Sequence, residues 1–212
     1  EPKLVGNQRN IVISDQSGKS NIISRLKTIG IEVDNEDSKI KKILNEVKDR
    51  EFIGYSYDGA DASFELLARR IIGEIPTYLT ISEYDVSVKK NNKGKIISIA
   101  KDHILVDGNE VVCEGEGNGP VNALDNAIRK NVDKVGKYSK YLKDLKLVDY
   151  KVRILNTGTE AITRVSIEST DSKGKNWFTI GVSTNIIEAS FKALIDSLDY
   201  KLFKEQAPAS KL

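Results

Sequence analysis

The chain has 212 residues, enough for one large or two small domains, and its 39% apolar residues can supply a hydrophobic core. Its 33 basic and 31 acidic side chains leave a net charge of +2, with no basic stripe of the kind that nucleic-acid binding needs. No apolar run approaches the roughly 20 residues of a membrane span, and no signal peptide is present. Composition thus argues against nucleic-acid and membrane partners and indicates a soluble globular protein.

The cysteine and histidine content argues against several kinds of site. Cys113 is the only cysteine and cannot form an internal disulfide, which fits a reducing cytoplasm. His103 is the only histidine and stands in the alternating stretch AKDHILVD, which is typical of a strand surface. We therefore expect no metal ligands, no cofactor and no catalytic residues in this chain. Because methionine is absent even at position 1, we expect a C-terminal piece of a longer protein.

The first 75 residues predict a small helical subdomain. A short apolar run, Ile11–Ile13, comes first. Apolar residues then recur at helical spacing in three segments, which are Ile22–Ile29, Ile40–Val47 and Ala60–Ile71. Gly73 follows the third segment and predicts its end.

Residues 78–203 predict a βββα unit that occurs twice. Strands are expected at 83–90, 95–106 and 110–116 with a helix at 120–135, and again at 147–155, 161–170 and 176–183 with a helix at 185–199. One three-stranded sheet with one helix cannot bury both of its faces, so two units should pack together about a pseudo-two-fold axis. The predicted fold is α+β, with a helical subdomain at 1–75 and a domain of two pseudo-symmetric βββα units at 76–212.

Two stretches resemble phosphate-binding loops but lack a required glycine. DQSGKSN (15–21) ends like a P-loop, yet Ile13 stands where the first glycine of that loop is needed. GEGNGP (115–120) has two glycines of a dinucleotide fingerprint, but Pro120 stands at the third and no parallel βαβ unit surrounds it. Neither stretch predicts a nucleotide site.

The helix start at Pro120 has the physical features of a carboxylate site. Proline suits the first turn of a helix, and the amides of Val121, Asn122 and Ala123 would then lack helical acceptors. The helix dipole favours an anion there by roughly 0.3–1 kcal/mol. A solvated glycine turn is the alternative interpretation. The second helix start offers Ser183 or Thr184 as an N-cap, so the sequence leaves open whether one start or both bind a ligand.

Several motifs, in order along the chain, carry a family resemblance. GNGPVNAL (117–124), with a later βββα unit that ends TIGVSTNIIEASFKALIDSLDY (179–200), resembles the C-terminal allosteric domain of the isopropylmalate and citramalate synthase family. GNQRNIVISDQSGKSNI (6–22) is similar to the linker that follows the catalytic barrel in that family. GYSYDGADASFELLARR (54–70) is most similar to the citramalate synthase branch. The resemblance covers almost the whole chain.

The resemblance implies a regulatory role. The family's enzymes condense acetyl-CoA with a 2-oxo acid, pyruvate in citramalate synthases, using a divalent metal in an upstream TIM barrel, so this chain should itself be inactive. The linker helices are expected to help complete the active site of a partner subunit. The C-terminal domain should form a homodimer and bind an inhibitory amino acid, isoleucine for citramalate synthases or leucine for isopropylmalate synthases. A purely structural dimerisation module is the alternative.

The resemblance also implies an effector pocket at matched positions. Its expected members are Gly117, Asn118, Gly119, Pro120 and Val121 at the helix start, Leu147, Tyr150 and Ile154 on the next strand, Thr163 and Ile167 on the strand after it, and Thr184 and Asn185 before the last helix. Leu147 and Tyr150 are an odd number of residues apart and would face opposite sides of a regular strand. If both line one pocket, a bend, a bulge or a helical turn is needed near Val148 and Asp149. Asp149 would either pair with the ammonium of the effector or lie on the surface.

Overall fold

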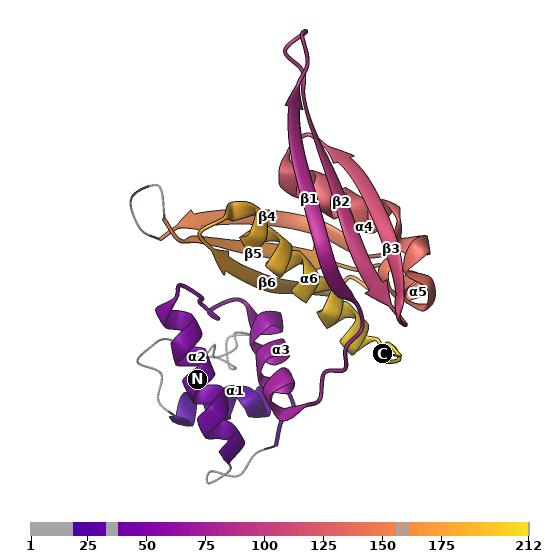
Figure 1. Cartoon of the computed structure of the whole chain (residues 1–212). Coiled ribbons are helices and arrows are strands. Elements are labelled where there is room, and N and C mark those ends of the chain that lie inside the picture. The colour runs from indigo at the N-terminus through magenta and orange to yellow at the C-terminus, as the bar shows by residue number, and fades with distance from the viewer. Residues whose placement is uncertain (1–18, 33–37, 156–157, 159–160, 212) are drawn as a thin grey trace.

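The computed structural model describes residues 19–32, 38–155, 158 and 161–211, so the predicted apolar run Ile11–Ile13 lies outside the described residues. In Figure 1, helices α1–α3 lie beside a layered domain in which α4 and α6 are placed between two three-stranded sheets. The expected α+β fold, with a helical subdomain followed by two βββα units, is confirmed.

The helical subdomain has the three expected helices, α1 (Lys19–Thr28), α2 (Ser38–Phe52) and α3 (Asp61–Ile72). Gly73 ends α3 in the left-handed conformation with φ 78°, as its position predicts. The apolar stripes meet in one buried cluster, whose largest members are Ile22, Leu26, Ile43, Tyr57 and Phe64. Ile180 of the second sheet belongs to the same cluster, so the subdomain packs directly on that sheet. The domain boundary at residue 75 stays a prediction.

The first unit consists of β1 (Thr80–Lys90), β2 (Ile96–Val106), β3 (Asn109–Gly117) and α4 (Pro120–Lys130). The second and third strands match the prediction within one residue and β1 begins three residues earlier than predicted, whereas the expected helix at 120–135 ends five residues early. The Asn131 side chain donates to the carbonyls of Ala127 and Glu114, both at 2.8 Å, and so ends α4 against β3. A 3₁₀ helix (Val132–Tyr138) and the short α5 (Ser139–Leu142) follow.

The second unit consists of β4 (Lys146–Ile154), β5 (Thr163–Thr170), β6 (Asn176–Ser183) and α6 (Ile186–Lys204). Both sheets are antiparallel, in the orders β1-β2-β3 and β4-β5-β6. The predicted strands are confirmed within two residues, and α6 continues to Lys204 rather than ending at 199. Its last turns contact the helical subdomain through Tyr200 and Lys204.

The two units repeat in detail. Tyr84 and Tyr150 each follow a bulge in the first strand of their unit, and they are 66 residues apart. The same spacing separates Gly115 from Gly181, and both glycines allow their helix to approach very closely. A Cβ atom would lie 2.2 Å from Ala127 N at Gly115 and 2.0 Å from Ala189 O at Gly181. Each helix therefore packs against the last strand of its own unit in the same way.

Helices α4 and α6 lie side by side and begin at the same end of the domain (Figure 1). Ile128 and Leu194 each stand eight residues into their helix, and both line one small cavity with Leu147 of β4. In the first unit, the ring of Tyr84 on β1 lies 4.5 Å from that of Phe191 on α6. The strand β1 of the first unit thus contacts the helix α6 of the second.

Candidate functional site

The predicted helix start at α4 is held close against the end of β3. A Cβ atom at Gly117 would lie 2.5 Å from the Ala123 amide nitrogen, so the close neighbour of this glycine is α4 itself. Gly119 is the N-cap in extended backbone, and among the described side chains none caps the helix. Pro120 has no N–H, so the first backbone donor of this helix is the amide of Val121. This amide has no acceptor in the preceding turn.

The turn before α4 is fixed by side chains while its tip stays open. Asn118 donates its backbone N–H to Asn122 Oδ1 at 3.2 Å, and Asn126 Nδ2 donates to the Glu116 carbonyl at 2.8 Å. A Cβ atom at Gly119 would meet nothing within 4 Å. A ligand can therefore approach the helix start without displacing a side chain at that position.

The start of α6 differs because it carries its own cap. The sequence predicts Ser183 or Thr184 as this cap, but the structure places Asn185 there. Asn185 Oδ1 accepts from the amides of Ile187 at 2.8 Å and Glu188 at 3.3 Å. Ser183 Oγ instead accepts from the Asn185 amide at 3.1 Å and donates to the Glu188 carboxylate at 2.7 Å. The first-turn amides of α6 are therefore satisfied within the chain.

The wall predicted on β4 faces the helical layer. The register with β5 shifts between Leu147 and Asp149, which confirms the irregularity near Val148 that a shared pocket requires. The Tyr150 hydroxyl lies 2.8 Å from Ser190 Oγ on α6. Leu147 lines the small cavity between the two helices.

The remaining wall residues lie on the same face of the second sheet. Tyr150 pairs with Ile167 and Ile154 with Thr163 across β4 and β5. Thr163 and Ile167 are buried, whereas Ile154 is 70% exposed at the end of β4. Within the described ranges no hydrogen bond or ring contact joins this wall to 117–121. The predicted residues therefore form two groups, one at the start of α4 and one beside the start of α6.

Asp149 lies on the surface and pairs within its own strand. Its carboxylate accepts from Lys151 Nζ at 2.6 Å and from the Tyr150 amide at 2.9 Å. These hydrogen bonds, the one from Lys151 first, hold the pKa of Asp149 below its usual value. Of the two roles considered for Asp149, this geometry corresponds to the surface one.

The internal repeat identifies residues that sequence reasoning missed. Tyr84 pairs with Asp102 across β1 and β2, just as Tyr150 pairs with Ile167 across β4 and β5. Asp102 therefore occupies in the first unit the place that Ile167 occupies in the second. Ser98, four residues before Asp102 on β2, lies opposite Gly117 at the end of β3. An alignment of the two units with each other, residue by residue, could have identified Asp102 and Ser98 from the sequence.

Asp102 is a buried carboxyl group whose loss of hydration is not offset by hydrogen bonds to the described residues. Its residue is 0% exposed, and neither carboxylate oxygen has a hydrogen-bond partner among the residues that the structure describes; the same holds for the Ser98 hydroxyl. Burial raises the pKa of Asp102 to about 7, an effect that neighbouring His103 only partly reverses. The first unit thus has a titratable group where the second has an aliphatic side chain.

An apolar rim of exposed side chains lies toward the β1–β2 hairpin, the end of β4 and the start of α6. Its members come from the projecting ends of β1, β2 and β4 and from the first residue of α6. They are Val88 (56% exposed), Ile96 (53%), Val152 (37%), Ile154 (70%) and Ile186 (45%). Exposed large apolar side chains become buried when another protein covers them, so this rim is a candidate contact surface.

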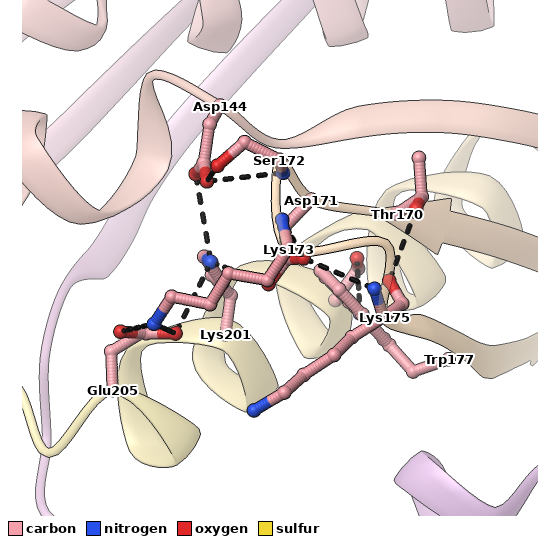
Figure 2. Close-up of polar contacts among 10 residues, drawn as sticks. Asp144, Thr170, Asp171, Ser172, Lys173, Lys175, Trp177, Lys201 and Glu205 are labelled. Atoms are coloured by element: carbon pink, nitrogen blue, oxygen red, sulfur yellow. Dashed lines mark hydrogen bonds and ion pairs between the residues drawn. The ribbon is translucent and has the colours of Figure 1, made fainter.

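A cluster of charges at the opposite end of α6 is structural (Figure 2). Lys201, 3% exposed, lies 2.7 Å from the Asp171 carboxylate, and Asp144 and Glu205 lie within 3.5 Å of its ammonium group. Burial lowers the pKa of Lys201, but these three carboxylates outweigh it and hold the pKa above its usual value. A lysine kept protonated in this way cannot act as a base, and its charge ties α6 to the β5–β6 turn.

Other kinds of site find little support in the described part of the chain. It contains no group of three or more His, Cys, Asp or Glu side chains that could hold a metal ion. None of its helices is both long and apolar enough to cross a membrane. A groove of about 990 Å³ separates α2 from β1 and α6, and its walls include Tyr55, Arg70, Tyr84 and Phe191. The effector residues expected from sequence do not line this groove.

Comparison with known proteins adds to this geometry. Residues 58–202 match the family model of the LeuA allosteric (dimerisation) domain. The chain is 44% identical over 208 residues to an (R)-citramalate synthase of Aquifex aeolicus and 42% identical over 208 residues to one of Geobacter sulfurreducens, in each case across 97% of this chain and 39% of the relative. It is 28% identical over 195 residues to a probable 2-isopropylmalate synthase of Methanopyrus kandleri, across 92% of this chain and 37% of that protein. The chain spans about two fifths of the length of the relatives it matches.

Proposed function

Because the chain belongs to the LeuA allosteric (dimerisation) domain family, we propose that it is the regulatory portion of a citramalate synthase, that it forms a homodimer and that it binds isoleucine. The parent enzyme condenses acetyl-CoA with pyruvate in a catalytic barrel, with a divalent metal, outside these 212 residues. Isoleucine, the end product, inhibits that reaction. The chain by itself has no catalytic activity and needs no cofactor.

The difference between the two helix starts is the observation that carries this proposal. Asn185 satisfies the amides of α6, whereas no described side chain caps α4 and the space beside Gly119 is open. The start of α4 thus offers the amide of Val121 and the positive end of the helix dipole to an anion of small size. The carboxylate of an amino acid fits this requirement.

In this proposal the ligand lies between the two groups, and the wall on β4 and β5 supplies the apolar part of the pocket. The Tyr150 hydroxyl is hydrogen-bonded to Ser190. Ile154 pairs with buried Thr163 across the strands and is itself exposed, as part of the rim. Burying a branched aliphatic side chain against such a wall contributes roughly 1.5–3 kcal/mol. The second copy of the chain covers the rim in the homodimer and closes the pocket from outside.

Leucine is the second candidate effector, because the chain is also similar to a probable 2-isopropylmalate synthase. Leucine and isoleucine differ only in the position of one methyl branch, and such a difference is worth only about 1–3 kcal/mol in a hydrophobic pocket. A structural dimerisation module, the third reading, keeps the apolar rim but binds neither amino acid.

Calorimetry on the chain with isoleucine, leucine and valine tests the proposal. We expect isoleucine to bind most tightly to a folded dimer, and binding weaker than millimolar for all three would refute the sensor function. Sedimentation measures separately whether the chain forms a dimer in solution. A mixture of the chain with acetyl-CoA and pyruvate should yield no citramalate, and activity there would refute the requirement for the barrel.

A matched pair of substitutions at Gly119 tests the carboxylate site itself. Gly119→Asp places a carboxylate at the N-cap, where it can accept from the first-turn amides and compete with the ligand. We expect this variant to fold normally and to lose isoleucine binding, while Gly119→Ala, which meets nothing within 4 Å, keeps it. Equal affinity in the two variants would place the carboxylate elsewhere.

A further inference from the structure

Helix α6 reaches from the candidate effector site to the helical subdomain. Its first turns carry the Asn185 cap and the contact between Ser190 and Tyr150. Its 19 residues, Ile186–Lys204, extend over about 28 Å at 1.5 Å per residue. The helix contains neither glycine nor proline, the residues at which helices most often bend.

The C-terminal half of α6 is bound to α3 by a fork of ion pairs. Arg70 Nη1 lies 2.7 Å from Asp196 Oδ1, and Arg70 Nη2 lies 2.7 Å from Asp199 Oδ2. The guanidinium group therefore holds two carboxylates that are neighbours on one face of α6. This geometry defines the position of α3 along α6.

The two carboxylates of this contact are largely buried, whereas Arg70 is 37% exposed and lines the groove beside α2. The side chains of Asp196 and Asp199 are only 19% and 15% exposed, and Asp199 Oδ1 is buried without a described partner. Burial raises the pKa of both carboxyls, that of Asp199 to about 6, although Arg70 acts in the opposite direction. Separating Arg70 from these two buried carboxylates would leave them without their cation, which is costly, so α3 is expected to follow α6 rather than slide past it.

A second set of contacts supports the same register. Glu65 of α3, 3% exposed, accepts from Lys204 Nζ at 2.7 Å and from the Tyr200 hydroxyl at 3.2 Å. Ser63 of α3 accepts from the Ile180 amide at 2.9 Å, at the edge of β6. Helix α3 is thus attached both to α6 and to the sheet beneath it.

We propose that α6 is the rigid element that connects the effector site to the linker helices, and that Arg70 is the positioning residue that makes α3 respond to it. This inference rests on the proposed function, because it concerns the response to a bound amino acid. Occupation of the pocket shifts the first turns of α6 relative to β4, and the fork at Arg70 transfers the shift to α3. An effector acts only through contacts that differ between two states; here these are the contacts of the first turns of α6 with β4, and the fork carries their change to α3.

Hydrogen exchange with and without isoleucine tests the inference on the 212-residue chain. We expect saturating isoleucine to slow exchange of the amides of 61–72 by about fivefold or more, the lower end of typical allosteric coupling. In Arg70→Gln, isoleucine should still bind within about threefold of its original affinity, but the ligand-dependent change in 61–72 should fall below about twofold. Lys173→Gln is the control, because exposed Lys173 pairs with Glu205 beyond the end of α6 and not with α3, so its loss should leave the response intact.

The outcomes separate this inference from the proposed function. A merely structural Arg70 predicts faster exchange in α3 with and without ligand and an unchanged ligand-dependent difference, which would overturn the inference. Isoleucine binding without any response of 61–72 in the original chain would overturn it as well and leave the sensor function standing. Failure of every branched-chain amino acid to bind would overturn both.

A second variant covers the case in which Arg70→Gln does not fold. Loss of Arg70 leaves two poorly hydrated carboxylates unpaired, so the combination of Arg70→Met with Asp196→Ala and Asp199→Ala removes all three charges together. Circular dichroism checks its fold. We expect this variant also to bind isoleucine and to show less than about a twofold response in 61–72, and a full response would overturn the inference.

Discussion

Replacing Asp102 by asparagine should remove a large part of the pH dependence of folding. The carboxyl group is 0% exposed and has no partner among the described residues, and burial raises its pKa from 3.8 to about 7. Asparagine has nearly the same shape and no charge. The variant therefore tests the burial of this carboxyl with little change in packing.

The sign of the effect follows from proton binding. Between pH 3.8 and about pH 7 the folded state holds a proton on Asp102 that the unfolded state has released. Raising the pH therefore destabilises the fold, and the loss is complete once the pH exceeds the folded pKa. Below the unfolded pKa both states are protonated and the group has no effect. This direction is opposite to that of ion-paired carboxyls such as Asp171, whose pKa is lowered.

The magnitude follows from the size of the shift. A change from 3.8 to about 7 is about three pKa units, and each unit corresponds to about 1.4 kcal/mol, so the full loss of stability is about 4 kcal/mol. Integrating the same proton linkage with these two pKa values puts about 3 kcal/mol of this loss between pH 5 and pH 8.

Urea unfolding at pH 5 and pH 8 measures the difference between the two proteins. The advantage of Asp102→Asn over the original chain should be larger at pH 8 by about 3 kcal/mol. Protein concentration must be held fixed, because dimer formation would shift the apparent stability. The control is Asp85→Asn on the exposed side of β1. If Asp102→Asn and the original chain show the same pH dependence, the conclusion that the Asp102 carboxyl is buried without a hydrogen-bond partner is refuted.

Three further substitutions test the packing described above. Gly115→Ala places a Cβ atom 2.2 Å from the backbone of α4 and should destabilise the fold by about 1–3 kcal/mol in urea unfolding. Gly119→Ala, whose Cβ atom would meet nothing within 4 Å, is the control and should not destabilise it. Similar urea midpoints for the two variants would contradict the close approach of α4 to β3. Asn185→Ala removes the N-cap of α6 and should lower the free energy of unfolding by about 1 kcal/mol, and a change near zero would mean that another group caps the helix. Lys201→Met leaves Asp171 buried without its cation and should lower the thermal midpoint by an amount equivalent to about 3–5 kcal/mol; a small shift would show that water reaches this cluster.

The candidate site could be predicted only in part. The bulge on β4 follows from the odd spacing of Leu147 and Tyr150 together with the requirement that both line one pocket, and the structure has that bulge. The cap of α6 could not be predicted securely, because Ser183, Thr184 and Asn185 are all good N-cap residues and only the backbone path selects among them. The effector role of these residues stays a prediction.

Local sequence patterns are sufficient to predict the kinds of elements in this protein and their order. Helical spacing, strand alternation and glycine stops are local patterns, and they can be recognised without knowing how distant segments pack. The tertiary structure alone decided where α4 ends, because the Asn131 side chain binds a carbonyl of β3 that lies 17 residues earlier. It also decided that Asp102 is buried and that Arg70 meets Asp196, a residue 126 positions away. Such burial and pairing depend on which surfaces meet, and no local pattern contains that information.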